Sequence, residues 1–147
     1  MKSDKKIIFF LFAAACTAPQ PPPGAAGPAE AVRDFAEAVH KGDTATAWSL
    51  LTSRAQAQAD QFAAAARAAT DAGPESGRQM LFTSALPGRV VDAKAVSQSG
   101  DSAEVQTSGG AGFGRPQGRS TGDGGAPRVW HVVREGGRWR IDLDLGH

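Results

Sequence analysis

The first half of the chain has apolar residues at intervals of three and four, which is the spacing of amphipathic helices. In the first such segment the apolar positions are Val32, Phe35, Ala36 and Val39. Pro28 suits the first turn of this helix, and Gly42 suits the left-handed position that follows its end. Asp43 is expected to cap a short second helix that contains Trp48. Helices are thus predicted from about residue 28 to about residue 84.

A third helix is predicted next, and it is rich in alanine. Ser53 and Gln56 have the spacing of a capping box at its start. The glycine and proline at residues 73–74 end it. Apart from Phe62, its side chains have little bulk. This helix can therefore approach a sheet closely. Residues 79–84 fit either a short fourth helix or an irregular apolar plug.

From residue 89 onward the apolar period changes to two, which indicates strands. The pattern predicts two hairpins, the first with strands at 90–98 and 102–107 and the second with strands at 128–134 and 138–145. Helices followed by strands predict the α+β class, with N-terminal helices packed on a curved antiparallel sheet of about four strands. A single domain is expected over residues 28–147.

The second hairpin has a well-determined register because Gly136 and Gly137 form a two-residue turn. This register places residue 134 opposite 139, residue 132 opposite 141 and residue 130 opposite 143. One face then collects Trp130, Val132, Trp139, Ile141 and Leu143. The other face carries Val129, His131, Val133, Arg140, Asp142 and Asp144. The first of these faces is expected to be buried.

The connection between the two hairpins, residues 108–127, contains eight glycines. Glycine loses more backbone entropy on ordering than any other residue, which opposes packing. We therefore expect a flexible loop here.

The start of the chain has the organisation of an export signal. Lysines at positions 2, 5 and 6 precede a short apolar segment, and small residues follow it up to residue 15. The apolar segment is much shorter than the roughly twenty residues that a spanning helix needs. Residues 1–15 are therefore predicted to be a signal peptide.

The stretch Ala13-Ala14-Ala15-Cys16 resembles the lipobox of bacterial lipoproteins, with Ala13 standing where leucine is usual. The resemblance implies that the Cys16 sulfur receives diacylglycerol and that its acyl chains hold the protein on a membrane. Each buried methylene of such chains contributes about 0.8 kcal/mol. The alternative is a plain secreted protein that is cut after an Ala-x-Ala site, with Cys16 incidental.

Residues 16–27 are predicted to be the lipidated cysteine and a proline-rich tether. A polyproline II conformation of about 3.1 Å per residue would hold the domain up to some 35 Å from the bilayer. The run of prolines at 21–23 also fits a ligand for a proline-recognition domain, although a spacer is the simpler interpretation. Thr17, where aspartate would signal inner-membrane retention, favours the outer membrane. The expected location is the cell membrane or outer membrane, facing the periplasm or exterior.

Composition excludes several classes of site. The formal net charge is +1, and the arginines are scattered, so no basic face for nucleic acid is indicated. The chain has one cysteine, which excludes an internal disulfide and a cysteine-based metal site. His40 and His147 are isolated, and no metal-ligand spacing occurs. We expect no cofactor and no metal.

Helices followed by a curved antiparallel sheet resemble the nuclear transport factor 2-like superfamily, a cone-shaped α+β fold. The segments that carry the resemblance are residues 31–35, 41–43, 47–51 and 132–141. The chain also resembles small lipoproteins of unknown function that carry this fold on a lipid anchor. The resemblance implies a pocket between the helices and the concave sheet face. Some members are isomerase- or cyclase-like enzymes, and many only bind ligands or partners.

Two sets of residues are candidates for such a pocket. The first set has bulky apolar side chains that either line a pocket or form the core: Trp48, Phe62, Trp130, Trp139 and Ile141. The second is His131 opposite Asp142, which is either an acid–base pair or an exposed cross-strand ion pair. The chain has no tyrosine, which removes the donor that isomerases of this superfamily normally use.

These observations lead to a hypothesis of a membrane-anchored lipoprotein whose domain binds a small apolar ligand or an envelope protein without catalysis. A small isomerase- or cyclase-like enzyme is the first alternative. A structural domain that forms a homodimer through its open sheet face is the second.

Overall fold

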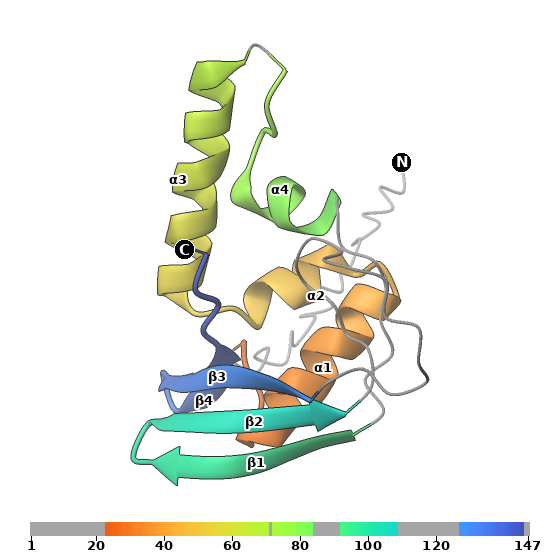
Figure 1. The fold of residues 1–147 in the computed structure, drawn as a ribbon, viewed down its shortest axis with the longest axis vertical. Helices are drawn as coiled ribbons and strands as arrows, with labels where there is room; N and C mark the ends of the chain where they lie inside the picture. Colours follow the sequence, from red (N-terminus) through yellow and green to blue (C-terminus); the bar gives the residue numbers. More distant parts are fainter. Residues whose placement is uncertain (1–22, 71, 84–91, 109–126, 146–147) are drawn as a thin grey trace, which may run out of the picture.

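The structure is a computed structural model that describes residues 23–70, 72–83, 92–108 and 127–145. In these ranges four helices are followed by four strands (Figure 1). The helices are α1 (Pro28–His40), α2 (Thr44–Ser49), α3 (Ser53–Ala69) and α4 (Gly77–Thr83). The strands are β1 (Asp92–Ser99), β2 (Ser102–Ser108), β3 (Arg128–Glu135) and β4 (Arg138–Ile141). The predicted α+β class is confirmed. The predicted signal peptide, Cys16, most of the tether and residues 109–126 of the glycine-rich loop lie outside the described residues.

The sheet is an antiparallel meander with the strand order β1-β2-β3-β4. The turn between β3 and β4 has positive φ angles of 59° and 79° at Gly136 and Gly137, as a two-residue hairpin turn requires. The predicted register is confirmed, because Val132 pairs with Ile141. The last predicted pair is wrong, since β4 ends at Ile141 and Leu143 lies beyond it.

The first helix begins and ends where the sequence predicts, and the second begins after the predicted cap, Asp43. Gly42 has a φ of 73° just after α1, and the side chain of Asp43 accepts a hydrogen bond from the Thr46 amide at 3.0 Å. Hydrogen bonds from Thr46 hold the pKa of the Asp43 carboxyl below its usual value.

The predicted capping box of the third helix is wrong, because Thr52 is the N-cap of α3 and Ser53 is its first residue. The Thr52 hydroxyl accepts a hydrogen bond from the Ala55 amide at 3.1 Å and donates one to Asp142 at 2.8 Å. Gln56 instead donates its side-chain amide to the Trp48 carbonyl at 2.7 Å. The contact with Asp142, 90 positions away, fixes the cap one residue earlier than the local pattern indicates.

The core lies between α1 and one face of the sheet (Figure 1). Its fully buried side chains of largest volume are Phe35, Leu51, Ile141, Val32, Val105, Val132, Thr52 and Thr107. The Phe35 ring contacts Trp130 edge-on at 5.9 Å between centroids, and Phe82 of α4 at 6.4 Å. Phe35 therefore joins α1, the sheet and α4.

Helix α3 packs against α4 rather than across the sheet, which differs from the close approach to a sheet that its alanines suggest (Figure 1). A Cβ atom on Gly77 would lie 2.5 Å from the Ala59 carbonyl carbon and 2.5 Å from the Asp60 nitrogen. The Gly77 amide donates to the Asp60 carboxylate at 2.7 Å. The small residues of α3 therefore admit the backbone of α4.

The outer edge of β4 is covered by two segments outside the named strands. Ala25 pairs with Trp139 in the antiparallel sense, and Leu51 pairs with Ile141 in the parallel sense. Ala25 belongs to the tether predicted from the sequence, but in the structure it is buried and pairs with the edge strand β4.

Candidate functional site

The bulky side chains on the inner sheet face form the core, which is the second of the two alternatives that the sequence leaves open. Trp130 and Trp139 are each 3% exposed, and Ile141 is fully buried. The Trp130 indole donates a hydrogen bond to the Thr107 hydroxyl at 3.1 Å. Trp48 is half-buried and packs against the same cluster. Trp48, Trp130, Trp139 and Ile141 therefore belong to the core of the described residues or pack against it.

Phe62 lies apart from this group. It stands on α3 with 42% of its surface exposed, and it is not among the residues packed on the core. Helix α3 turns it away because Ala55, Ala59 and Ala63 are the buried side of the helix.

The side chains of His131 and Asp142 have different partners. His131 is exposed, and its Nδ1 atom lies 3.8 Å from Oε1 of Glu104 on the neighbouring strand. Asp142 accepts two hydrogen bonds from Arg54, at 3.0 Å from Nε and 2.7 Å from Nη2, which raise the pKa of the arginine. The predicted His131–Asp142 pair is therefore absent among the described side chains, and Asp142 serves instead to hold α3 on the sheet.

Glu135 makes a second connection between α3 and the β3–β4 hairpin. Its carboxylate accepts hydrogen bonds from the Ser53 amide at 3.2 Å, the Ser53 hydroxyl at 3.1 Å and Arg140 at 3.3 Å. A carboxylate at a helix N-terminus also interacts favourably with the helix dipole. These contacts stabilise the hairpin against the helix.

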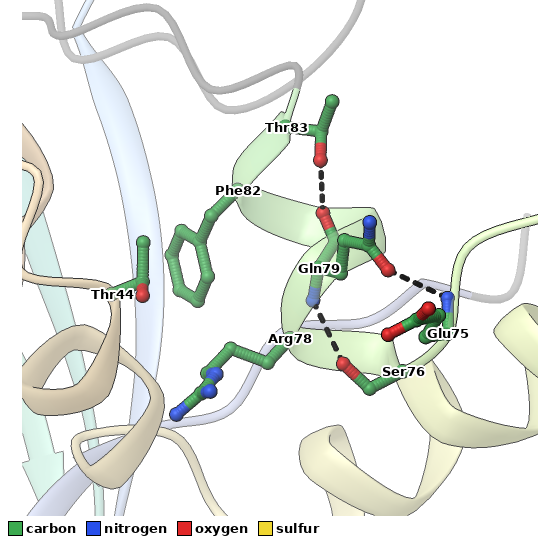
Figure 2. A pocket seen from close by; sticks show the side chains of 7 residues that line it. All are labelled: Thr44, Glu75, Ser76, Arg78, Gln79, Phe82 and Thr83. Carbon is green, nitrogen blue, oxygen red and sulfur yellow. Dashed lines mark hydrogen bonds between the residues drawn. The ribbon is translucent and has the colours of Figure 1, made fainter.

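A hollow of about 400 Å³ lies between the start of α2 and the length of α4 (Figure 2). Its lining residues are Thr44, Glu75, Ser76, Arg78, Gln79, Phe82 and Thr83. Arg78 and Phe82 are four positions apart on α4 and so share one face of it. Figure 2 shows both side chains on the side of α4 that faces Thr44, with Glu75 on the opposite side. Behind Phe82 lies Phe35, so the aromatic wall of the hollow rests on the core.

Several polar groups of the hollow are already hydrogen-bonded to one another within α4 and the two residues before it. The Gln79 amide donates to the Ser76 hydroxyl at 3.2 Å, and the Thr83 hydroxyl donates to the Gln79 carbonyl at 2.6 Å. The Gln79 side chain accepts from the Glu75 amide at 2.6 Å. In the described part of the chain, no hydrogen bond or ion pair holds the Arg78 guanidinium.

The hollow therefore offers a cation, the Thr44 hydroxyl and an aromatic ring to one molecule. A guanidinium presents five N–H donors in a planar fork that matches a carboxylate. A hydroxyl adds one more donor, and a ring partly buried against the core gains from covering its remaining apolar surface. This arrangement suits a small organic anion that has an apolar part.

Sequence reasoning missed Arg78 and Thr44. The one available signal is the four-residue spacing of Arg78 and Phe82, which places them on one side of any helix over residues 77–83. No sequence signal shows that Thr44 faces them, because that depends on how α2 and α4 pack.

No three residues among the described His, Cys, Asp and Glu come together as a group that could hold a metal ion. Within the same ranges, no helix combines the length and apolar character needed to cross a bilayer. Comparisons with protein-family models, with curated proteins and with solved structures gave no match.

Proposed function

We propose that this chain is a lipid-anchored protein of the cell envelope whose domain binds a small organic anion without catalysing a reaction. Cys16 carries the acyl chains, and the domain faces the periplasm or the exterior from the cell membrane or outer membrane. The support for the anchor is the export signal that ends at Cys16. The nuclear transport factor 2-like fold belongs to this proposal as well, supported by helices that precede an antiparallel sheet.

One observation carries the binding proposal: the Arg78 guanidinium lines a hollow beside Phe82 and Thr44 without a partner of its own among the described residues. Most surface arginines need no ligand. Arg78 differs because the aromatic ring four residues later is fixed by the core, so a bound anion places its charge and its apolar part in defined positions. A carboxylate attached to an aromatic ring matches both positions.

Replacing Arg78 with glutamine should lower the affinity for such an anion by about tenfold to a hundredfold, since a hydrogen bond to a charged group contributes about 1.5 to 3 kcal/mol. The probe is 2-naphthoate, with neutral 2-naphthalenemethanol as the uncharged analogue. Dissociation constants come from NMR titration, which also shows whether the perturbed amides belong to the residues that line the hollow.

Arg67→Gln is the matched control, because Arg67 is also an exposed arginine, but it lies on α3 away from the hollow. We expect this variant to bind 2-naphthoate as the unmodified protein does, and the alcohol to bind more weakly than the acid. Equal affinities of the Arg78 variant and the unmodified protein would refute the site. Amide shifts confined to residues away from the lining of the hollow would do the same.

A further inference from the structure

The end of the predicted tether is part of the sheet. The Ala25 amide donates to the Trp139 carbonyl and the Trp139 amide donates to the Ala25 carbonyl, both at 3.0 Å. Arg138 donates from Nε to the Gly24 carbonyl at 3.0 Å. Gly24 has a φ of 120°, and a Cβ atom there would lie 2.6 Å from the Cβ of Arg138. The chain is therefore fixed to β4 from residue 24 onward.

This attachment shortens the connection between the domain and Cys16. Pro23 follows Cys16 by seven positions. A chain segment spans at most about 3.6 Å per residue, so these two residues are at most about 25 Å apart whatever conformation lies between them. The corresponding distance for a tether that ends at residue 27 would be about 40 Å.

The domain is larger than this distance. About 120 residues fold to a radius of gyration near 14 Å, which corresponds to a diameter of about 35 Å. Helix α3 alone has 17 residues and a length of about 25 Å. Figure 1, which has the longest axis vertical, places the start of α1 beside the sheet at one end and the C-terminal end of α3 at the other.

We infer that the edge of β4 and the start of α1 face the bilayer, and that the C-terminal end of α3 points away from it. The inference rests on the proposed lipidation of Cys16. If the domain stood on the α3 end, its attachment at residue 24 would lie farther from the lipid than about 25 Å, because the domain is about 35 Å across. The interaction surface is thus the exposed part of the domain beside the Ala25–Trp139 bridge, and its partner is the lipid headgroup layer.

Charge does not set this orientation. Near the attachment point, the carboxylate of Asp34 on α1 interacts electrostatically with charged groups of both signs. These groups are Arg33, Arg138, Glu30 and Glu37. Because both signs are present, anionic headgroups gain little from this surface. The orientation should therefore be the same on neutral and on anionic vesicles.

The test uses the full-length lipoprotein with one added cysteine as a fluorescent label site, at Ala26 beside the attachment point or at Ala68 near the end of α3. Both alanines are exposed and small. Each labelled protein is reconstituted in phosphatidylcholine vesicles that carry a nitroxide on the headgroup, with and without phosphatidylglycerol. We expect at least fivefold stronger quenching for the Ala26→Cys label than for the Ala68→Cys label on both membranes.

Twenty glycine and serine residues inserted between Pro22 and Pro23 should reduce this ratio towards one. Equal quenching of the two labels without the insertion, in protein that floats with the vesicles, would overturn the orientation and leave the anchor intact. Protein that does not float with the vesicles would instead overturn the proposed anchor, and the orientation with it.

Discussion

Replacing Phe35 with alanine is expected to lower the free energy of unfolding by about 3 to 5 kcal/mol. Phe35 is fully buried and contacts Trp130 of the sheet and Phe82 of α4. Its removal leaves a cavity at the place where α1, the sheet and α4 meet. Since a domain of this size is stable by only about 5 to 15 kcal/mol, the loss is a large part of the total.

Phe62→Ala is the matched control for this prediction, because it deletes the same ring from a position that is 42% exposed. We expect it to cost less than about 1 kcal/mol. Urea denaturation followed by tryptophan fluorescence measures both variants, since Trp130 and Trp139 are buried in the folded protein. Equal losses for the two variants would mean that Phe35 is not the centre of the core.

Replacing Gly77 with alanine should destabilise the protein by about 1 to 3 kcal/mol through a clash between α4 and α3. The added methyl group would meet the backbone at Ala59 and Asp60 at 2.5 Å, and backbone atoms cannot turn aside as a flexible side chain does. The higher helix propensity of alanine offsets at most about 1 kcal/mol. Amide hydrogen exchange should show α4 opening more often, because its packing on α3 is the contact that is lost.

Gly27→Ala tests whether the effect is specific to close packing. Gly27 precedes α1 with an extended φ of −129°, and the nearest atom to an added Cβ is the Glu30 carboxylate at 3.7 Å. This variant should lose less than about 1 kcal/mol. If Gly77→Ala is no more costly than Gly27→Ala, α3 and α4 do not pack as closely as the structure indicates.

The elements that the sequence predicts well depend on neighbouring residues. The β3–β4 register follows from Gly136 and Gly137, because a two-residue turn leaves one pairing that buries the apolar face. The end of α1 and the cap of α2 follow from Gly42 and Asp43 for the same reason. Such local signals are complete within a few residues.

The features that the sequence misses depend on residues far apart in the chain. Thr52 rather than Ser53 caps α3 because Asp142 holds the Thr52 hydroxyl. Strand register alone pairs Asp142 with His131. In the structure Asp142 is instead hydrogen-bonded to Arg54, and His131 lies beside Glu104. The hollow beside Arg78 depends on how α2 and α4 pack, and the pairing of Ala25 with Trp139 depends on how the tether returns to β4. Periodicity contains no information on these contacts.

The candidate site is the part that the sequence predicts least well, because periodicity does not separate bulky apolar residues that line a pocket from those that form the core. Trp130 and Trp139 face inward in either case, and the packing of Phe35 on Trp130 is visible only in the folded structure. No sequence pattern distinguishes Arg78 from other surface arginines. Its position beside Phe82 and Thr44 in the hollow is visible only in the folded structure.

The most direct test of the proposed membrane anchor is the mass of the mature N-terminal peptide, isolated from cells that express the full chain. We expect the peptide to begin at Cys16 and to carry diacylglycerol on its sulfur, and we expect Cys16→Ser to move the protein from the detergent phase to the aqueous phase. A mature peptide that begins elsewhere, or one that contains Cys16 as a free thiol, would contradict the proposed anchor.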